Sequence, residues 1–221
     1  VELLRTSNQK IATWSLGHRP QLEPLVESID LNHFWIDRTI DPQIIELNKN
    51  GARNGHIPIS AIFSCVGTVL TVLTGYQDVV VSNEASASEP NLEYLGVQIN
   101  HQYSKSLEYE TSYQEVLASL FGDSIRYYSS LRPFSELKIA EIFASVAFDK
   151  YKGVFSSCNR AFTQTSDSLS WCGECAKCAF TFLILTPFID RTALESVFGG
   201  KNLLLDASLE KHSANLAKVE Q

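Results

Sequence analysis

The stretch Trp171-Cys172-Gly173-Glu174-Cys175-Ala176-Lys177-Cys178 places three cysteines at Cys-x2-Cys-x2-Cys spacing, and Cys158 lies a short way upstream. Four thiols in one such window are a usual ligand set for a tetrahedral zinc ion. Gly173 permits the backbone angles that a tight turn between two ligands often needs. The spacing therefore predicts a zinc site with Cys158, Cys172, Cys175 and Cys178 as its ligands.

A disulfide pair and scattered free cysteines are the alternatives to this zinc site. Zinc is favoured because the chain has the character of a cytosolic protein, and thiols rarely cross-link in that compartment. Four thiolate ligands leave no open coordination position, so we expect the ion to be structural and the chemistry to lie elsewhere. The fifth cysteine, Cys65, falls in an apolar helical pattern and is predicted to be a small core residue.

Composition indicates a globular protein of one domain, or of one domain with a small appendage. The chain has 221 residues, of which 44% are hydrophobic and 19% charged. A net charge of −7 and a pI near 5.2 argue against a nucleic-acid surface, although a local basic pocket for phosphate stays open. No apolar run approaches the roughly 20 residues that span a bilayer, and no signal peptide is recognisable. We therefore expect a cytoplasmic protein without membrane insertion.

The start of the chain is unusual. It opens on Val1, contains no methionine, and residues 1–5 have the pattern of the end of an amphipathic helix. We expect an N-terminal portion to precede Val1; the lack of methionine reflects either a biased composition or methionines omitted from the sequence.

Short β-type segments alternate with helical patterns, which is typical of an α/β protein with a parallel sheet. Residues 78–82 are the clearest strand and are predicted to be a central one, because their β-branched run is apolar on both faces. Residues 59–74 are predicted to form a long apolar helix that ends at Gly75, and residues 135–150 to form one amphipathic helix.

Two polar segments are candidates for a ligand site. In open α/β sheets, ligands bind beyond the carboxyl ends of the strands, so residues 83–91 are well placed unless they form an ordinary surface turn. Residues 97–106 combine an imidazole, an ammonium, hydroxyls and amides, which suits a phosphate or carboxylate ligand. The same segment is equally compatible with a solvated connector.

Five motifs in order resemble the UDP-N-acetyl-α-D-muramoyl-L-alanyl-L-glutamate epimerase family. These motifs are Asn54-Gly55-His56-Ile57-Pro58, Ser82-Asn83-Glu84-Ala85-Ser86-Ala87-Ser88, Asn100-His101-Gln102-Tyr103-Ser104-Lys105-Ser106, Leu131-Arg132-Pro133 and the cysteine stretch. A four-cysteine cluster after an α/β domain also resembles the ATP pyrophosphatase superfamily, including the 7-cyano-7-deazaguanine synthases. The resemblance covers nearly the whole chain.

The resemblance implies an adenine nucleotide α-hydrolase-like domain in residues 1–150 and a zinc-bearing helical lobe in residues 151–221. It implies ATP and Mg²⁺ as cofactors and a UDP-linked muramoyl dipeptide as substrate. The terminal L-glutamate of this substrate would be activated as an acyl-adenylate, and the configuration of its α-carbon would be inverted, with release of AMP and pyrophosphate. The superfamily's Ser-Gly-Gly-type phosphate loop is absent here, and we expect it in the N-terminal portion before Val1.

The resemblance also implies roles for single residues. Glu84, His101 and Lys105 are the candidates for the proton-transferring base, and the sequence does not choose among them. The candidates for binding the nucleotide, its Mg²⁺ or other anionic groups are Asn54, His56, Ser82, Asn83 and Arg132, with His101 and Lys105 as further anion contacts. Each of these residues has a structural alternative, such as a helix cap or a surface pair.

Three other functions stay open. One is a different adenylating ligase or amidating enzyme of the same superfamily, and another is a zinc-stapled nucleotide-binding module without turnover. A zinc module that binds DNA or RNA is disfavoured by the acidic balance and the lack of a basic stripe.

Overall fold

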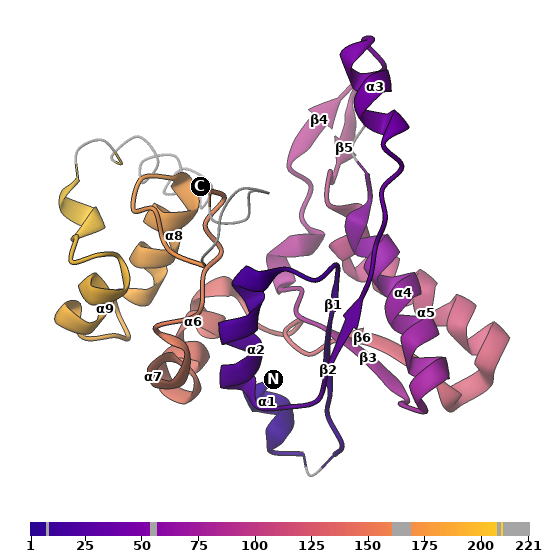
Figure 1. Cartoon of the computed structure of the whole chain (residues 1–221), viewed down its shortest axis with the longest axis horizontal. Helices are drawn as coiled ribbons and strands as arrows, with labels where there is room; N and C mark the ends of the chain where they lie inside the picture. The colour runs from indigo at the N-terminus through magenta and orange to yellow at the C-terminus, as the bar shows by residue number, and fades with distance from the viewer. Residues whose placement is uncertain (8, 54–56, 161–168, 207–208, 210–221) are drawn as a thin grey trace. The chain divides into compact units, whose positions relative to one another are not determined.

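A computed structural model describes residues 1–7, 9–53, 57–160, 169–206 and 209 (Figure 1). By packing, the chain divides into two compact units. One unit combines residues 1–38 with residues 137–221, and the other is residues 39–136. None of the helices in the described part of the chain has the length and apolarity that crossing a bilayer requires.

Two parallel strands form the centre of the unit of residues 39–136. Strand β3 (Asp78–Val81) pairs with β6 (Arg126–Ser129), with Asp78 opposite Arg126 and Val81 opposite Ser129. Helix α4 (Ile59–Thr74) packs against β3, and α5 (Leu107–Phe121) packs against β6 (Figure 1). This arrangement confirms the predicted α/β class with parallel strand pairing. A small core of Val79, Leu117, Ile125 and Tyr127 lies between the layers.

Helix α4 has the predicted bounds. It ends because Gly75 adopts a left-handed conformation, with φ of 74°, while its N–H still donates to Thr71. Its buried face is formed by small residues: Ser64, Gly67, Thr68 and Thr71. The hydroxyls of Thr68 and Thr71 donate to carbonyls one turn earlier, so these polar groups are buried with their hydrogen bonds made.

Three expectations about these elements are wrong. Cys65 is exposed, because the inward face of α4 is formed by Ser64, Gly67, Thr68 and Thr71 and does not include it. Among the described residues, β3 has β6 on one side only, and Val79 is its one buried residue, so it is no central strand. The helix expected over residues 135–150 is interrupted at Ala147, where φ is −136°, and forms α6 (Glu136–Val146) and α7 (Phe148–Tyr151).

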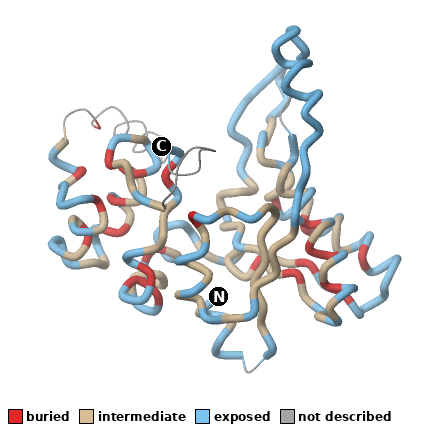
Figure 2. The backbone as a smooth tube through the Cα atoms, in the orientation of Figure 1, coloured by how far each residue is buried: buried red, intermediate tan, exposed pale blue. Residues whose placement is uncertain are grey.

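The other elements of this unit are short. Helix α3 (Gln43–Lys49) begins where the Asp41 carboxylate accepts the N–H of Gln43. Strands β4 (Leu92–Tyr94) and β5 (Val97–Ile99) form an antiparallel hairpin. Helix α3 and β4 are exposed along their whole length, as the pale blue tube in Figure 2 shows. Single 3-10 turns occupy Ala85–Ser88 (η2), Tyr103–Lys105 (η3) and Gly122–Ser124 (η4).

The second unit joins the N-terminal residues to the C-terminal helices. Strands β1 (Thr13–Leu16) and β2 (His33–Ile36) pair in parallel across a connection that contains η1 (Pro20–Leu22) and α2 (Glu23–Ile29). Glu2 of α1 (Glu2–Arg5) accepts hydrogen bonds from Tyr151 and Lys150. The main core of this second unit lies among α6, α8 (Ala176–Leu185), α9 (Arg191–Val197) and η5 (Leu203–Leu205). It includes Phe182, Leu194 and Phe198.

Candidate metal centre and candidate active site

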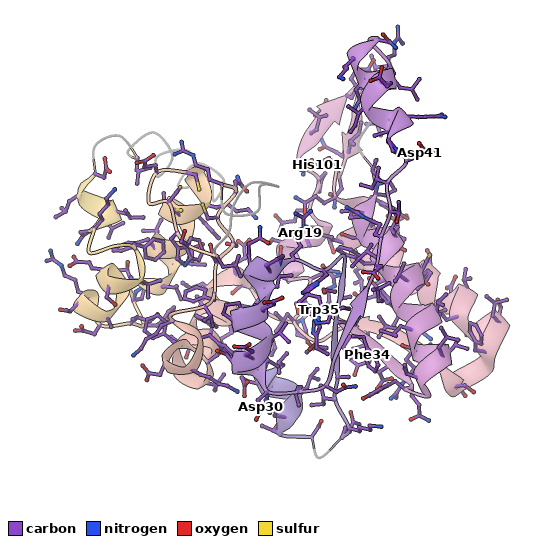
Figure 3. All side chains as sticks on the ribbon, viewed as in Figure 1. Arg19, Asp30, Phe34, Trp35, Asp41 and His101 are labelled. Carbon is purple, nitrogen blue, oxygen red and sulfur yellow. The ribbon has the colours of Figure 1, made fainter. Side chains whose placement is uncertain are left out.

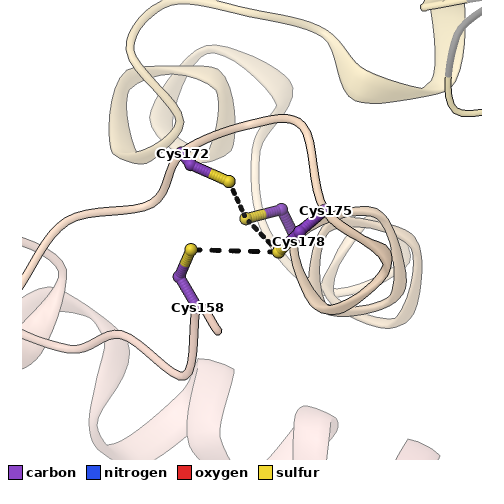
Figure 4. Close-up of side chains that lie close together, drawn as sticks. All are labelled: Cys158, Cys172, Cys175 and Cys178. Carbon is purple, nitrogen blue, oxygen red and sulfur yellow. Dashed lines mark hydrogen bonds between the residues drawn. The ribbon is translucent and has the colours of Figure 1, made fainter. Parts of the chain in front are cut away.

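The four predicted zinc ligands converge on one point. The Sγ atoms of Cys158, Cys172, Cys175 and Cys178 all lie within 4.8 Å of one another (Figure 4). Cys158 and Cys172 come from loops, Cys175 directly precedes α8, and Cys178 lies in the first turn of that helix. Gly173 has a φ of 71°, which is the conformation that the turn between Cys172 and Cys175 was expected to need.

The sulfur spacing fits a tetrahedral ion. The Sγ–Sγ distances are 3.8 Å for Cys158 to Cys175, 3.7 Å for Cys172 to Cys178 and 3.4 Å for Cys175 to Cys178. A tetrahedron with Zn–S bonds of about 2.3 Å has edges of about 3.8 Å. None of the five cysteines, all of which the structure describes, forms a disulfide, which contradicts a disulfide pair. The cluster can therefore hold a metal ion.

The cluster belongs to the hydrophobic core of its unit. Cys158 and Cys178 are both 0% exposed, and Trp171, Cys172 and Cys175 pack against the same core. Burial raises the pKa of the Cys178 thiol and also that of Cys172. A raised pKa disfavours the thiolate form of Cys172 and Cys178, and a bound metal cation would favour it.

A second cluster lies at the carboxyl ends of β3 and β6, on three segments that are distant in sequence. Residues 82–88 follow β3, residues 100–106 follow β5, and residues 130–134 follow β6. The Ala85 N–H donates to the Phe134 carbonyl at 3.2 Å, and Asn100 Nδ2 donates to the Ala87 carbonyl at 2.8 Å. These bonds join the predicted ligand loop to the two other segments, and bring Glu84, Lys105 and Arg132 into one neighbourhood.

Arg132 is bound to protein groups on every side. Its Nη1 donates to the Glu84 carbonyl at 2.8 Å, and its Nη2 donates to the Lys105 carbonyl at 2.7 Å. Its Nη2 also donates to Glu110 Oε2 at 2.9 Å, and the two side chains are only 12% and 11% exposed. The other carboxylate oxygen of Glu110 accepts the N–H of Ser129, the last residue of β6.

His101 and Lys105 are linked through the side chain of Gln102. Lys105 Nζ donates to Gln102 Oε1 at 2.7 Å, and Gln102 Nε2 lies 3.4 Å from His101 Nε2. Asn91 contacts the His101 ring at Nδ1 and accepts its backbone N–H. His101 itself is exposed and lies close after β5 (Figure 3). Two of the candidate bases therefore lie on one hydrogen-bonded chain.

Carboxylates gather beside Glu84. Partial desolvation raises the pKa of Glu136, and the negative charges of Glu84 and Glu89 raise it further. A carboxyl group with a raised pKa among other carboxylates takes up a proton more readily than an ordinary glutamate does.

The remaining predicted residues are placed less fully. Ser82 is exposed just beyond β3, and the Asn83 carbonyl accepts a hydrogen bond from the Ser129 hydroxyl at 2.7 Å. Asn54 and His56 lie outside the described residues. Sequence reasoning missed Gln102, Glu110 and Glu136. Gln102 lay inside a quoted motif, whereas nothing in the local sequence around Glu110 or Glu136 points to the segments that they contact.

Comparison with known families matches the chain in two parts. The MurL N-terminal domain matches residues 1–130, and the MurL C-terminal domain matches residues 154–221. The second match contains all four cysteines of the cluster.

Similar proteins are found in three bacteria, and each bears the name UDP-N-acetyl-alpha-D-muramoyl-L-alanyl-L-glutamate epimerase. The protein of Salinispora tropica is 47% identical over 206 residues, which are 93% of this chain and 44% of that protein. The protein of a Micromonospora species is 42% identical over 201 residues, or 85% of this chain and 44% of that protein. The protein of Xanthomonas oryzae pv. oryzae is 38% identical over 211 residues, or 94% of this chain and 46% of that protein. The chain thus spans less than half the length of these relatives.

Proposed function

This chain belongs to the MurL family, and on that premise we propose that it takes part in inverting the terminal L-glutamate of UDP-N-acetylmuramoyl-L-alanyl-L-glutamate to D-glutamate. The observation that carries this proposal is the match of two MurL domains, over residues 1–130 and 154–221. Relatives that are 38% and 47% identical and named as this epimerase support the same reaction. The product would be a precursor for peptidoglycan synthesis.

We propose that ATP drives the inversion by activating the glutamate α-carboxylate. An α-proton beside a carboxylate is very weakly acidic, because its removal would leave two negative charges on one enediolate. Attack of the carboxylate on the α-phosphorus of ATP would form an acyl-adenylate and release pyrophosphate. A side-chain base can then take the α-proton, and return of a proton to the opposite face gives the D-configuration. Water would release AMP and the D-glutamate carboxylate.

Inversion needs proton donors and acceptors on both faces of the α-carbon. Glu84 lies on the segment after β3, and His101 and Lys105 lie on the segment after β5, so the candidates come from two different segments. We propose that the α-carbon is held between these segments. Glu136, with its raised pKa beside Glu84, is a further group for proton storage.

We further propose an adenine nucleotide α-hydrolase-like domain in residues 1–150 and a zinc-bearing lobe in residues 151–221. The position of Ser82 and Asn83 just beyond the carboxyl end of β3 supports a nucleotide-binding role, because open α/β sheets bind ligands at that edge. Asn54 and His56 are proposed for the same role from their motif. Carboxylates such as Glu84 suit a hard cation such as Mg²⁺, which would neutralise phosphate charge. The cytoplasm, where ATP is supplied and thiols stay reduced, is the compartment that we propose.

The test is a coupled assay with ATP, Mg²⁺ and UDP-N-acetylmuramoyl-L-alanyl-L-glutamate, using the chain within its full-length protein. The products are hydrolysed, the glutamate enantiomers are resolved, and AMP is measured in parallel. D-glutamate that appears together with AMP supports the proposal. AMP without D-glutamate would indicate an adenylating ligase or amidating enzyme, and substrate binding without either product would indicate a binding module.

A further inference from the structure

We propose that Arg132 is a positioning residue that holds the main chain at Glu84 and at Lys105 in fixed relative places, and that Glu110 orients it. This inference rests on the proposed function, because it concerns the two segments that carry the candidate bases. It gives Arg132 a different role from the one expected from sequence, which was direct contact with an anionic ligand.

The hydrogen bonds of the guanidinium carry the argument. Nη1 donates to the Glu84 carbonyl at 2.8 Å and lies 3.4 Å from Ser88 Oγ, so this nitrogen faces the segment after β3. Nη2 donates to the Lys105 carbonyl at 2.7 Å, so it faces the segment after β5. A planar guanidinium presents its donors at fixed angles. The two carbonyls are therefore held in one geometry by one rigid group.

Glu110 determines the direction in which the guanidinium faces. Its Oε2 accepts from both Nε and Nη2 of Arg132, at 3.3 Å and 2.9 Å. Its Oε1 accepts the Ser129 N–H at 3.1 Å, which ties the pair to the end of β6. Because the pair is almost fully buried, neither side chain can turn toward solvent without leaving the other charge unpaired.

These contacts leave little of Arg132 for a substrate anion. Its three nitrogens all donate to protein acceptors, and its side chain is 12% exposed. Lys105, by contrast, directs its Nζ to the neutral amide of Gln102. Glu110 balances the charge of Arg132. The function of Arg132 is to hold the main chain at Glu84 and at Lys105 in fixed positions.

The test compares Arg132→Lys with the matched control Arg126→Lys. Arg126 pairs through its Nε and Nη2 with the two carboxylate oxygens of Asp78, at 2.7 Å and 2.9 Å, and its side chain is 55% exposed. That pair lies at the opposite ends of the same two strands, away from both candidate segments. Lysine keeps the charge in both variants, but it has a single flexible ammonium and cannot hold two carbonyls in one fixed plane.

Two readouts are needed, both on full-length protein. Hydrogen–deuterium exchange reports whether the amide hydrogens of residues 84–88 and 103–107 are protected from exchange with solvent. Steady-state kinetics report kcat and KM for ATP and for the UDP-linked substrate. For Arg132→Lys we expect faster exchange in both segments and a kcat lowered about tenfold or more, with KM little changed, because small misplacement of catalytic groups lowers rates strongly. Arg126→Lys should change neither readout.

The outcomes separate this inference from the proposed function. A raised KM with unchanged kcat would mean that Arg132 contacts the substrate directly, and unchanged exchange or unchanged kcat would equally overturn the positioning role. If Arg132→Lys fails to fold, exchange on the unaltered protein decides: amides of residues 84–88 and 103–107 that exchange as fast as an unstructured chain would overturn the positioning role. If the unaltered protein forms neither AMP nor D-glutamate, the proposed function fails, and the exchange measurement alone decides whether Arg132 holds the two segments.

Discussion

If the four-cysteine cluster holds a metal, its removal should unfold the proposed zinc-bearing lobe of residues 151–221 before the rest of the chain. The expected effect is large, because Cys158 and Cys178 are 0% exposed and share a core with Phe182, Leu194 and Phe198. Structural zinc in small modules binds with about 10–16 kcal/mol. At free zinc about 1,000 times its dissociation constant, the bound state gains about 4 kcal/mol over the metal-free state.

That free energy converts to a measurable shift in melting temperature. For a unit of about 60–100 residues, each 1 kcal/mol shifts the midpoint by about 4–8 °C. Chelation of the zinc should therefore lower the melting midpoint of this lobe by about 16–32 °C, measured by calorimetry with and without a zinc-selective chelator. X-ray absorption at the zinc edge should give four sulfur neighbours at about 2.3 Å.

Cysteine variants supply the control. Cys178→Ser should lose stoichiometric zinc and melt like the chelated protein, because a buried hydroxyl replaces one of four thiolates. Cys65→Ser should keep the metal and the melting midpoint, since Cys65 is exposed and lies outside the cluster. Equal midpoints with and without chelator, or a metal content that is the same in Cys178→Ser, would refute the reasoning.

Three further predictions concern single residues. Glu110→Gln should lower the free energy of unfolding by about 3–5 kcal/mol in urea titrations, because it leaves the charge of Arg132 buried and unpaired; a loss below about 1 kcal/mol would show that the pair is solvated. Gly75→Ala should lower the free energy of unfolding by about 1–2 kcal/mol, since alanine disfavours a φ of 74°. Gly153→Ala is the control, because Gly153 does not have a left-handed φ. Desolvation lowers the pKa of His33 below its usual 6.5, so the unfolded chain binds the proton more readily and stability should fall as pH drops through 6.5. His33→Gln should flatten that pH dependence of the urea midpoint, and an unchanged slope would exclude this histidine as its source.

Features that depend on neighbouring residues were predictable from the sequence. The Cys-x2-Cys-x2-Cys spacing is short enough that one turn and the start of α8 bring three sulfurs together, and the Sγ distances agree with the predicted tetrahedral site. Helix α4 has its predicted bounds because Gly75 ends it locally. The parallel strand pairing and the family resemblance were likewise predictable, because both rest on short patterns along the chain.

The inward face of α4 was decided only by tertiary packing. Its apolar pattern predicted a buried Cys65, yet the helix buries Ser64, Thr68 and Thr71 and exposes Val69 and Leu73. Small side chains let the helix approach its neighbours closely, and hydroxyls bonded to the preceding turn can be buried at little cost. The hydrophobicity of the residues alone therefore does not predict which face of α4 is buried.

The candidate active site shows the same division. The sequence supplied Glu84, Lys105 and Arg132 as separate motifs, and it predicted that Arg132 binds a ligand. Only the folded chain reveals that Arg132 directs its donors to the carbonyls of Glu84 and Lys105 and to a carboxylate 22 residues away. The physical reason is the distance along the sequence over which each interaction acts. Capping, turn geometry and ligand spacing depend on residues a few positions apart, whereas the partners of a buried charge depend on which distant segments the fold brings beside it.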